Sequence, residues 1–357
     1  MRPDGSPRRR FNPAAFAAMA LVMTDTKPII AIATGDPAGI GPEISMKAAL
    51  DANVRAICRP ILVGDPGVLM RHAQACGIGA AIEVVERLDD VKMNGDTTSH
   101  LTLLACPTTE NIAFSETGAA SGRASLASAS AAIKTALAGA VDAVVAAPMN
   151  QTSIAMAGIA FDGYPSFVAR ETGLARDDVY LMLCFGAFKI VHCTLHVSVR
   201  EALSLINRER VLHSIVTADR TLKRLGVASP RISVGGLNPH AGEGGLFGPE
   251  EIDIIKPAIA DAVKVGIAAT GPFGADTMFH QKDVDAFIVM LHDQGHITAK
   301  LLARNATAGL AIGSPILFSS VAHGSGHDIV GKGLASPAAM IEAVTRLAKA
   351  GRVRADA

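Results

Sequence analysis

Short apolar runs alternate along the chain with longer stretches in which apolar residues recur every three to four positions. The runs are bounded by glycine, proline or polar residues, and they predict buried strands at residues 29–34, 59–64, 141–147, 231–234 and 286–290. The longer stretches predict helices at residues 66–75, 121–138, 209–225, 249–265 and 336–349. For the last helix, we expect Ser336 as the N-cap and Pro337 at the first position. Strands that alternate with helices favour a parallel sheet, so the expected fold class is α/β.

One segment departs from this alternation. Residues 179–198 contain two β-rich apolar runs on either side of Gly186, and His196 lies at the end of the second run. This pattern predicts an antiparallel hairpin. We interpret the hairpin as an exposed arm that is used for dimerisation.

Composition narrows the function classes. With 357 residues the chain is long enough for two domains that share a cleft, or for one large domain. Its formal net charge is zero, and no cluster of Lys and Arg follows the first ten residues, which argues against a nucleic-acid binder that relies on positive charge. Five cysteines lack a C-x-x-C spacing and lie in apolar surroundings. They are typical of reduced core cysteines in a cytoplasmic protein.

The N-terminal segment differs from the rest of the chain in its pattern of charged and apolar residues. Three arginines, Arg8 to Arg10, precede an apolar stretch that Pro13 interrupts and that is too short to span a bilayer. We therefore expect no membrane association. Met23 lies directly before the first predicted strand and is a second candidate for the start of the protein. We expect residues 1–27 to be a disordered or wrongly assigned extension.

The segment 291–296 concentrates chemically active side chains at the end of a predicted buried strand. His292, Asp293 and His296 fall within five positions, beside Gly295. A lone histidine is more often structural, but this density at the carboxyl end of a strand is typical of a ligand site. Imidazole is both the commonest metal ligand and a ready acid or base. The segment predicts either a metal site or a proton-transfer site.

Three glycine-rich segments are further candidates for ligand contact. Residues 35–43 form a turn between a strand and a helix that Pro42 opens, which is a general arrangement for binding an anion and a weak signal alone. Residues 235–245 follow a strand with more glycines than a plain connection needs, so we interpret them as a ligand-contacting loop. Residues 322–333 form the third segment, with His323 and His327 among its glycines.

Together these motifs resemble the 4-hydroxythreonine-4-phosphate dehydrogenase family. The resemblance rests on residues 35–43, 236–245, 292–295 and 323–331 and runs from about residue 28 to the last helix. It implies a fold like that of isocitrate and isopropylmalate dehydrogenases, with two α/β domains, a cleft between them and a homodimer. We expect residues 28–148 with 305–357 to form the first domain. Residues 149–304 would form the second, with the metal and substrate site and the dimer contacts.

The family's metal and phosphate sites are incomplete in this sequence. The resemblance implies a divalent metal such as zinc held by three histidines, of which His196 and His292 match, while Tyr164 replaces the third. A phenol is a poor ligand, so His296 or water would have to substitute. At the phosphate site, Gln151, Gly309 and Phe318 replace a Lys, an Asn and an Arg. A phosphate dianion requires such cations, so we expect a substrate that is not a phosphate ester.

A branch of the family with the same departures is the terephthalate 1,2-cis-dihydrodiol dehydrogenase group, which the chain resembles at residues 157–166, 194–196 and 291–297. This resemblance implies oxidation of a cyclic cis-dihydrodiol carboxylate to a β-keto acid, which loses carbon dioxide and becomes 3,4-dihydroxybenzoate. The hydride acceptor would be NAD or NADP. One alternative is oxidation of a phosphorylated β-hydroxy acid such as 4-phosphohydroxythreonine. Another is a catalytically inactive sensor that binds a dinucleotide.

The resemblance and the motifs together assign roles to individual residues. We expect a catalytic group of His196, His292, Asp293 and Lys300. The residues expected to bind substrate are Asn150, Gln151, Tyr164, His296 and Lys300. The residues expected to bind the dinucleotide are Gly35, Asp36, Asn238, His240, Gly242, Glu243, His323, Gly324 and Asp328.

Overall fold

One twelve-stranded sheet forms the centre of the protein. The computed structural model describes residues 27–88, 100–303 and 308–350. Within this part of the chain, the strand order is β3-β4-β2-β1-β5-β12-β11-β6-β7-β10-β8-β9. The strands are β1 (Ile29–Ala33), β2 (Arg59–Gly64), β3 (Ala81–Val85), β4 (His100–Ala105), β5 (Ala143–Ala146), β6 (Tyr180–Phe185), β7 (Phe188–His192), β8 (Arg231–Gly235), β9 (Ala268–Phe273), β10 (Ala286–Val289), β11 (Ala308–Ile312) and β12 (Leu317–Val321).

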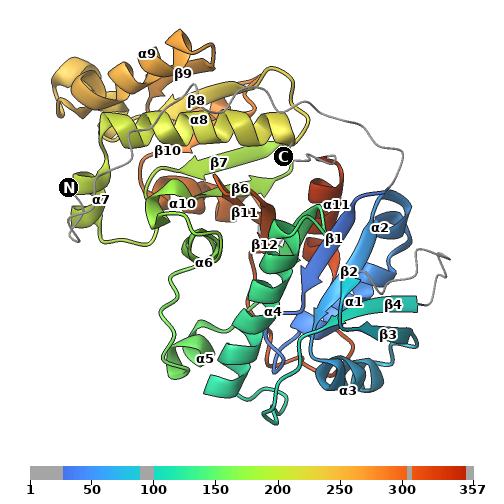
Figure 1. Ribbon diagram of the computed structural model, residues 1–357. Coiled ribbons are helices and arrows are strands. Elements are labelled where there is room, and N and C mark those ends of the chain that lie inside the picture. Colours follow the sequence, from blue (N-terminus) through green and yellow to red (C-terminus); the bar gives the residue numbers. More distant parts are fainter. Residues whose placement is uncertain (1–26, 89–99, 304–307, 351–357) are drawn as a thin grey trace.

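The sheet consists of two parallel portions joined by antiparallel pairs. Neighbouring strands from β3 to β12 are parallel, and so are those from β7 to β9. Strand β11 runs antiparallel to both β12 and β6, and β6 runs antiparallel to β7. Figure 1 shows the two portions at opposite ends of the molecule, with β11 and β12 between them. These antiparallel pairs of β11, β12, β6 and β7 form the central junction of the sheet, which joins the two parallel portions.

Helices cover the sheet, as the alternating pattern predicts. They are α1 (Gly41–Leu50), α2 (Ala52–Ile57), α3 (Pro66–Cys76), α4 (Ala119–Leu137), α5 (Gln151–Met156), α6 (Tyr164–Glu171), α7 (Val199–Leu205), α8 (Arg208–Arg224), α9 (Lys256–Lys264), α10 (His292–Leu302) and α11 (Ala338–Ala348). Shorter helical turns are η3 (Arg176–Asp178), η4 (Pro239–Gly245), the π-helix η5 (Glu251–Ile255) and η6 (Met278–His280).

Helix α3 illustrates why the local sequence sets the boundaries. Asp65 caps its N-terminus by accepting a hydrogen bond from the Val68 backbone N–H at 2.8 Å, and Pro66 occupies the first turn. Gly77 ends the helix with φ of 65°, a left-handed conformation that glycine adopts without steric cost. These residues place the ends of α3 within one residue of the predicted range 66–75.

The inner strands β1, β5 and β10 are buried on both faces, as the uninterrupted apolar runs predict, whereas the edge strands β3 and β9 are partly exposed. Alternate residues of β1 enter different cores: Ile30 and Ile32 pack on one face of the sheet, and Ala31 and Ala33 on the other. All four are completely buried. The α/β fold class is confirmed, because a sheet covered on both faces needs helices on both sides.

Two details of the sequence interpretation are wrong. The hairpin of β6 and β7 forms, but it is not an exposed arm, because β6 also pairs with β11 and β7 also pairs with β10 inside the sheet. The last helix begins at Ala338, with Pro337 as its N-cap, and not at Ser336. The expected extension at residues 1–27 lies outside the described residues except for Lys27. The expected domain boundaries stay a prediction.

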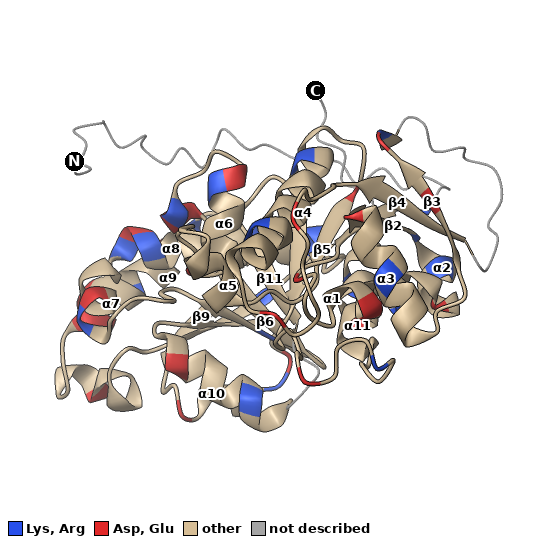
Figure 2. Ribbon diagram, turned by 90° about the horizontal axis from the view of Figure 1, so that it is seen from below, with Lys and Arg blue, Asp and Glu red and all other residues tan. Residues whose placement is uncertain are grey.

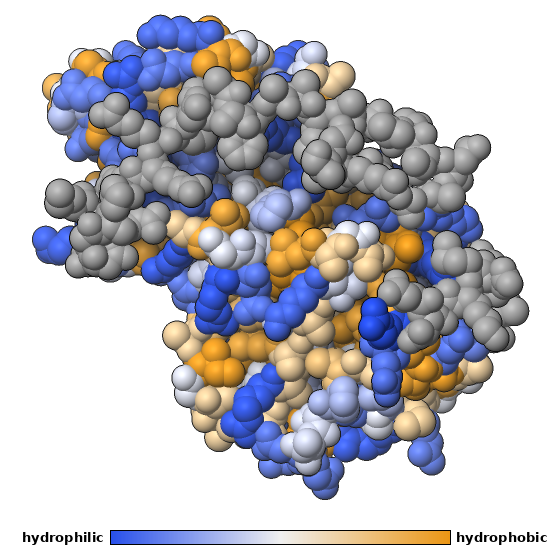
Figure 3. Space-filling view, viewed as in Figure 1, coloured by the Kyte–Doolittle hydropathy of each residue, from blue (hydrophilic) through white to orange (hydrophobic). Residues whose placement is uncertain are grey.

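The distribution of charged residues on the surface agrees with the formal net charge of zero. Figure 2 shows basic and acidic residues interspersed over the side that it presents, without a field of one charge. In Figure 3, hydrophilic residues dominate the part of the surface near α8 and α9, and apolar residues are visible in the middle of the face. Among the described residues, no helix combines the length and the apolar character needed to cross a membrane.

The central junction leads to a stability prediction. Leu310 lies on β11 and is 1% exposed. We expect Leu310→Ala to lower the free energy of unfolding by about 2–5 kcal/mol, because it removes buried methyl groups and leaves a cavity. Denaturant-induced unfolding measures the change. Leu137→Ala, at the 45% exposed end of α4, is the control and should cost less than about 0.5 kcal/mol. Equal losses in the two variants would contradict the prediction.

Candidate active site

Three predicted site histidines lie together at the carboxyl ends of β7 and β10. His292 and His296 occupy successive turns of α10, and their rings stack in parallel with centroids 3.8 Å apart. His196 follows β7, and its ring centroid lies 5.4 Å from that of His292. The structure therefore brings together residues from two segments about a hundred positions apart. This is the edge of a parallel sheet where α/β proteins bind ligands.

Each of these imidazoles has its Nδ1 atom against a protein acceptor. Nδ1 of His292 lies 2.7 Å from a carboxylate oxygen of Asp293, and Nδ1 of His196 contacts the backbone carbonyl of Asp162. Nδ1 of His296 lies 3.3 Å from the carbonyl oxygen of His292. Because carbonyl and carboxylate oxygens accept and do not donate, each Nδ1 carries the proton. The Nε2 atoms remain to interact with a ligand.

A fourth histidine belongs to this cluster, and the sequence analysis missed it. His192, the last residue of β7, is 1% exposed, and its Nε2 lies 3.1 Å from Nδ1 of His296. Burial lowers the pKa of His192 to about 3, with His296 as a further cause. Burial and the neighbouring His292 lower the pKa of His296 to about 4. Both rings are therefore neutral at neutral pH. The one signal for His192 in the sequence was a polar residue inside an apolar strand.

Gln294 anchors the start of α10 and was also missed. Its side-chain oxygen accepts hydrogen bonds from the backbone N–H groups of Met290 and Leu291, at 2.9 and 3.0 Å. Its amide donates to the carbonyl of Gly236 at 3.1 Å. This side chain satisfies backbone groups where the strand turns into the helix. It also ties the histidine cluster to the glycine-rich loop that follows β8.

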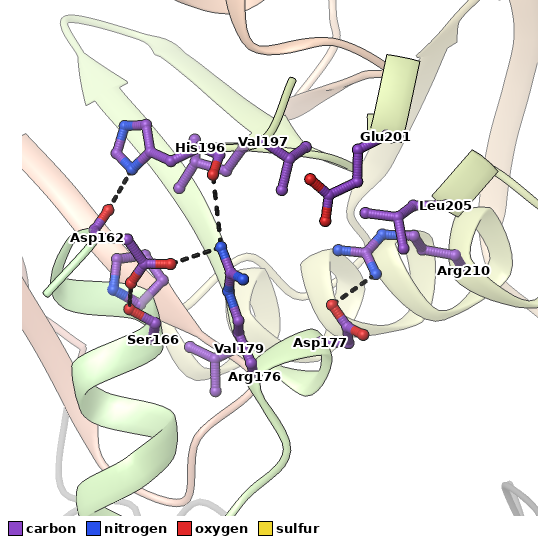
Figure 4. A pocket seen from close by; sticks show the side chains of 12 residues that line it. Asp162, Ser166, Arg176, Asp177, Val179, His196, Val197, Glu201, Leu205 and Arg210 are labelled. Carbon is purple, nitrogen blue, oxygen red and sulfur yellow. Dashed lines mark hydrogen bonds and ion pairs between the residues drawn. The ribbon is translucent and has the colours of Figure 1, made fainter. Parts of the chain in front are cut away.

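A charged pocket lies behind His196 (Figure 4). Arg176 forms an ion pair with Asp162 at 2.5 Å and donates a longer hydrogen bond of 3.5 Å to the carbonyl of His196. Arg210 pairs with Asp177 at 2.9 Å on the opposite side of the pocket. Because Asp162 also accepts the Nδ1 proton of His196 through its carbonyl, Arg176 holds the segment that orients this imidazole.

Tyr164 does not have the surroundings of a metal ligand. Its hydroxyl donates to the carbonyl of Ala147 at 3.1 Å, and its ring lies 4.9 Å from that of Phe318. Burial raises the pKa of Tyr164, which disfavours the phenolate that a metal would bind. Within residues 27–88, 100–303 and 308–350, no group of three His, Cys, Asp or Glu side chains is placed to hold a metal ion. The residues of one chain do not fit the expected three-ligand site, and we derive no step through a metal.

The remaining candidates for substrate binding lie on two elements. Lys300 is exposed on α10, two turns beyond His292 and one turn beyond His296. Asn150 follows β5 and caps α5 by accepting a hydrogen bond from the Ser153 backbone at 3.0 Å. Gln151 is exposed at the start of the same helix. The side-chain oxygen of Asn150 thus accepts a hydrogen bond within the protein, whereas Lys300 and Gln151 are exposed residues.

Asp36, which we expected to contact the cofactor, lies in the interior of the protein. Its carboxylate is completely buried and accepts hydrogen bonds from the backbone of Ala38, from Ser121 and from Nε2 of His327 at 2.8 Å. It joins the turn that begins at Gly35 to the loop that contains His327. These partners satisfy the hydrogen-bonding capacity of the buried carboxylate. Asp36 therefore positions the two predicted cofactor segments.

The third segment of predicted cofactor residues follows β12. Within it, His323 and Asp328 are at least partly exposed and Gly324 is exposed, whereas Ser325 is buried. The carbonyl of Ser325 accepts a hydrogen bond from the backbone of Ile40 at 2.7 Å. A side chain at Gly39 would collide with this carbonyl, because its Cβ would lie 2.4 Å from the oxygen. Gly39 is thus required for the two segments to pack.

The loop from Asn238 to Gly245 has an unusual backbone. Five consecutive residues from His240 to Gly244 have φ between 43° and 77°, although three of them are not glycine. Glu251 stabilises the start of the loop, because its buried carboxylate accepts hydrogen bonds from the backbone N–H groups of Leu237 and Asn238. It also packs against Gly242. His240 and Glu243 are exposed on the surface of the loop, whereas Gly242 is buried and Asn238 is partly buried.

The support by Glu251 predicts a pH-dependent contribution to stability. Burial acts to raise the pKa of Glu251, but hydrogen bonds from Asn238 and Leu237 outweigh it and lower the pKa. A carboxyl with a lowered folded-state pKa stabilises the fold above its unfolded-state pKa, and this contribution is lost as the pH falls through the folded-state pKa. We expect Glu251→Gln to melt at a lower temperature than wild type at pH 7, with the difference closing below about pH 4.5. Thermal unfolding across this range is the measurement.

Asp253→Asn is the control, because Asp253 is exposed in the same short helix. Its melting temperature should stay close to that of wild type at every pH. A difference for Glu251→Gln that is the same at pH 7 and pH 3.5 would contradict the assigned role.

Comparison with known proteins identifies relatives along almost the whole chain. A protein of Comamonas sp. named 1,2-dihydroxy-3,5-cyclohexadiene-1,4-dicarboxylate dehydrogenase is 41% identical over 327 residues, 91% of this chain and 98% of the relative. A putative D-threonate 4-phosphate dehydrogenase of Clostridium botulinum is 36% identical over 330 residues, 92% of this chain and 98% of the relative.

Solved structures agree with these relatives. A 4-hydroxythreonine-4-phosphate dehydrogenase from Burkholderia phymatum superimposes with a TM-score of 0.80 at 32% identity, covering 92% of this chain and 100% of the other. A terephthalate 1,2-cis-dihydrodiol dehydrogenase from Burkholderia xenovorans LB400 has a TM-score of 0.68 at 39% identity, covering 92% and 99%. The family model described as pyridoxal phosphate biosynthetic protein PdxA matches residues 56–347. The resemblance seen in the motifs is confirmed, and the chain belongs to the PdxA family.

Proposed function

We propose that the protein is a dehydrogenase that oxidises and decarboxylates a cyclic cis-dihydrodiol dicarboxylate, with terephthalate cis-dihydrodiol as substrate and 3,4-dihydroxybenzoate as product. The observation that carries the proposal is the 41% identity, across nearly the full length of both chains, to a protein named for such a substrate. A structure with the related terephthalate name also matches along the chain. The proposal rests further on the chemistry of the site.

The aromatic surroundings of Tyr164 favour a flat substrate over a phosphate ester. Tyr164 packs against Phe318, Phe161 and Phe167, with ring centroids between 4.9 and 6.4 Å apart. Phe318 is 1% exposed on β12, and Gly309 lies on the adjacent β11. Neither residue offers the charge-assisted hydrogen bonds that a phosphate dianion requires. Apolar walls with a few polar groups suit a six-membered carbon ring.

The cluster of imidazoles supplies the polar groups for this reaction. His196 and His292 would bond to substrate oxygen atoms through Nε2, with Asp162 and Asp293 orienting the two rings. Lys300, exposed on the same helix as His292, would pair with a carboxylate of the substrate. Oxidation converts the secondary alcohol into a β-keto acid. Loss of carbon dioxide then restores aromaticity, so the enolate oxygen becomes a phenol when it takes up the proton that the hydroxyl gave away.

A nicotinamide cofactor, when bound, accepts hydride from the carbinol carbon. The residues present fit such a dinucleotide, because the exposed glycine backbone at Gly244 and Gly245 allows close approach of a phosphate group. His240 and Glu243 on the same loop, and His323 and Asp328 on the other, are the side chains that we propose to contact it. The proposal leaves NAD and NADP as equal candidates.

We also propose that the protein acts as a cytoplasmic homodimer. Helix α10, which carries His292 and His296, exposes Ile297, Leu301 and Leu302 by 56, 78 and 59%. Apolar side chains that are exposed together are typical of an interface with a partner subunit. All five cysteines are free thiols, which suits a reducing compartment.

Two alternatives remain to be tested against this proposal. Relatives named as D-threonate 4-phosphate dehydrogenases keep a phosphorylated hydroxy acid such as 4-phosphohydroxythreonine as the second candidate substrate. An inactive sensor that binds a dinucleotide is the third candidate. The retained pair of His196 and His292, close in space, favours an active enzyme over a sensor.

The deciding measurement is reduction of NAD and NADP by the purified protein. With terephthalate cis-dihydrodiol we expect turnover, with 3,4-dihydroxybenzoate as the product. The same assay with 4-phosphohydroxythreonine should give no turnover. Exclusive turnover of the phosphate ester would overturn the proposal, and cofactor binding without turnover of either compound would favour the sensor. Repeating the assay with a chelator shows whether a metal takes part.

His292→Ala provides a second test. We expect it to lower kcat for the diol by at least about 100-fold, because the imidazole contacts the reacting atoms in the proposed site. Circular dichroism should show an intact fold. His280→Ala, an exposed histidine in η6 outside the cluster, is the control and should keep normal turnover. Near-normal activity of His292→Ala would remove the residue from the mechanism.

A further inference from the structure

The pair formed by His192 and His296 has no role in the reaction as described so far. His192 lies at the end of β7 and is almost completely buried, whereas His296 on α10 is partly exposed. Their facing nitrogen atoms are 3.1 Å apart, which is hydrogen-bonding distance. A buried imidazole that contacts a site residue has a specific partner, unlike a histidine that merely fills a core.

The protons on both rings follow from the acceptors around them. Nδ1 of His192 lies 3.4 Å from the carbonyl oxygen of Leu181, which can accept a hydrogen bond and cannot donate one. Nδ1 of His192 therefore carries the ring proton, and Nε2 has a lone pair. Nδ1 of His296 faces this lone pair and also the carbonyl of His292 at 3.3 Å. Two acceptors at the same atom place the proton of His296 on Nδ1.

This arrangement leaves Nε2 of His296 as a lone-pair acceptor. Among the residues that the structure describes, no hydrogen-bond partner is found for this atom. Removal of His192 would leave Nδ1 with one longer hydrogen bond to a backbone carbonyl. The ring would then lose its nearer fixed partner and could exchange its proton between the two nitrogen atoms.

Gly295 makes the close packing of this pair possible. A Cβ atom at residue 295 would lie 2.4 Å from Nε2 of His192 and 2.9 Å from the side chain of Ile190. Any larger residue would displace the buried ring from its position below α10. The glycine before His296 thus serves the histidine pair, since its φ is not in the left-handed region.

We propose that His192 is a positioning residue that holds His296 in the tautomer with a free Nε2, so that Nε2 accepts the hydrogen bond and the proton of the substrate's secondary hydroxyl. This inference rests on the proposed function. As the O–H bond breaks, the proton moves to Nε2 of His296, and the electron pair of the adjacent C–H bond leaves as hydride to the nicotinamide. After carbon dioxide has departed with the C–C bond broken, Nε2 returns the proton to the enolate oxygen and the phenol forms.

The first test reads the tautomer directly and needs no turnover. In protein labelled with ¹⁵N at histidine, couplings between ring nitrogens and ring protons report which nitrogen of His296 is protonated. We expect Nδ1–H for wild type and for His192→Gln, because a glutamine amide can donate to Leu181 and accept from His296. His192→Phe keeps the volume without the hydrogen bonds, and we expect a mixture of tautomers. An unchanged Nδ1–H tautomer in His192→Phe would overturn the proposal.

The second test separates positioning from packing through steady-state kinetics with the diol. We expect His192→Phe to lower kcat by about 10- to 100-fold while KM changes less than about 3-fold, as is typical when a residue that supports a catalytic group is lost. His192→Gln should recover most of kcat. His213→Phe is the control, because His213 is also a partly buried histidine, bonded to Tyr180 outside the cluster. It should lose stability without a fall in kcat.

The outcomes distinguish this inference from the proposed function. Absence of turnover in wild type would overturn the proposed function, while the tautomer of His296 would still test the structural role of His192. Turnover in wild type with an equal kcat in His192→Phe would leave the proposed function intact and overturn the inference. Equal losses of kcat in His192→Phe and His192→Gln, with equal losses of stability, would show that packing alone explains the effect.

Discussion

A polar side chain that is removed from water must find hydrogen-bond partners, and the loops of the candidate site depend on this requirement. Asp36 links the turn after β1 to the loop that contains His327 by hydrogen bonds to both. Glu251 holds the backbone at Leu237 and Asn238. Gln294 joins the start of α10 to Gly236. In each case a buried or partly buried acceptor satisfies backbone groups of a loop, and the loop surface is left free for a ligand.

The same principle governs the histidine cluster. The imidazoles of His196, His292 and His296 all direct Nδ1 at an oxygen of the protein, so Nε2 of each ring is available. His192 lies in the interior and contacts Nδ1 of His296, and burial keeps the His192 ring neutral. A site of oriented imidazoles suits the proposed exchange of a proton with a substrate hydroxyl. Tyr164, in contrast, directs its hydroxyl at the carbonyl of Ala147.

The continuous sheet explains how distant segments reach one site. Strands β11 and β12 come from the C-terminal part of the chain and pair between β5 and β6. Strand β11 carries Gly309, and β12 carries Phe318. The ring of Phe318 packs against Tyr164, which is the first residue of α6. The hydroxyl of Tyr164 reaches the end of β5, while Gly163 lies against His196 after β7. The segment 162–164 therefore connects the two parallel portions of the sheet at the candidate site.

The sequence by itself determined the elements and the family. Apolar runs, helix-starting prolines and turn glycines act over a few positions, so they predicted β1, β2, β5, β6, β7, β8 and β10 and the helices α3, α4, α8, α9 and α11, whereas β3, β4 and β9 were not predicted. Long motifs in a fixed order identified the PdxA family and the histidines of α10. Tertiary structure alone decided that the hairpin of β6 and β7 lies inside the sheet, that Asp36 is buried and that His192 contacts His296. These properties depend on pairing and burial between residues far apart in the chain, which local patterns do not encode.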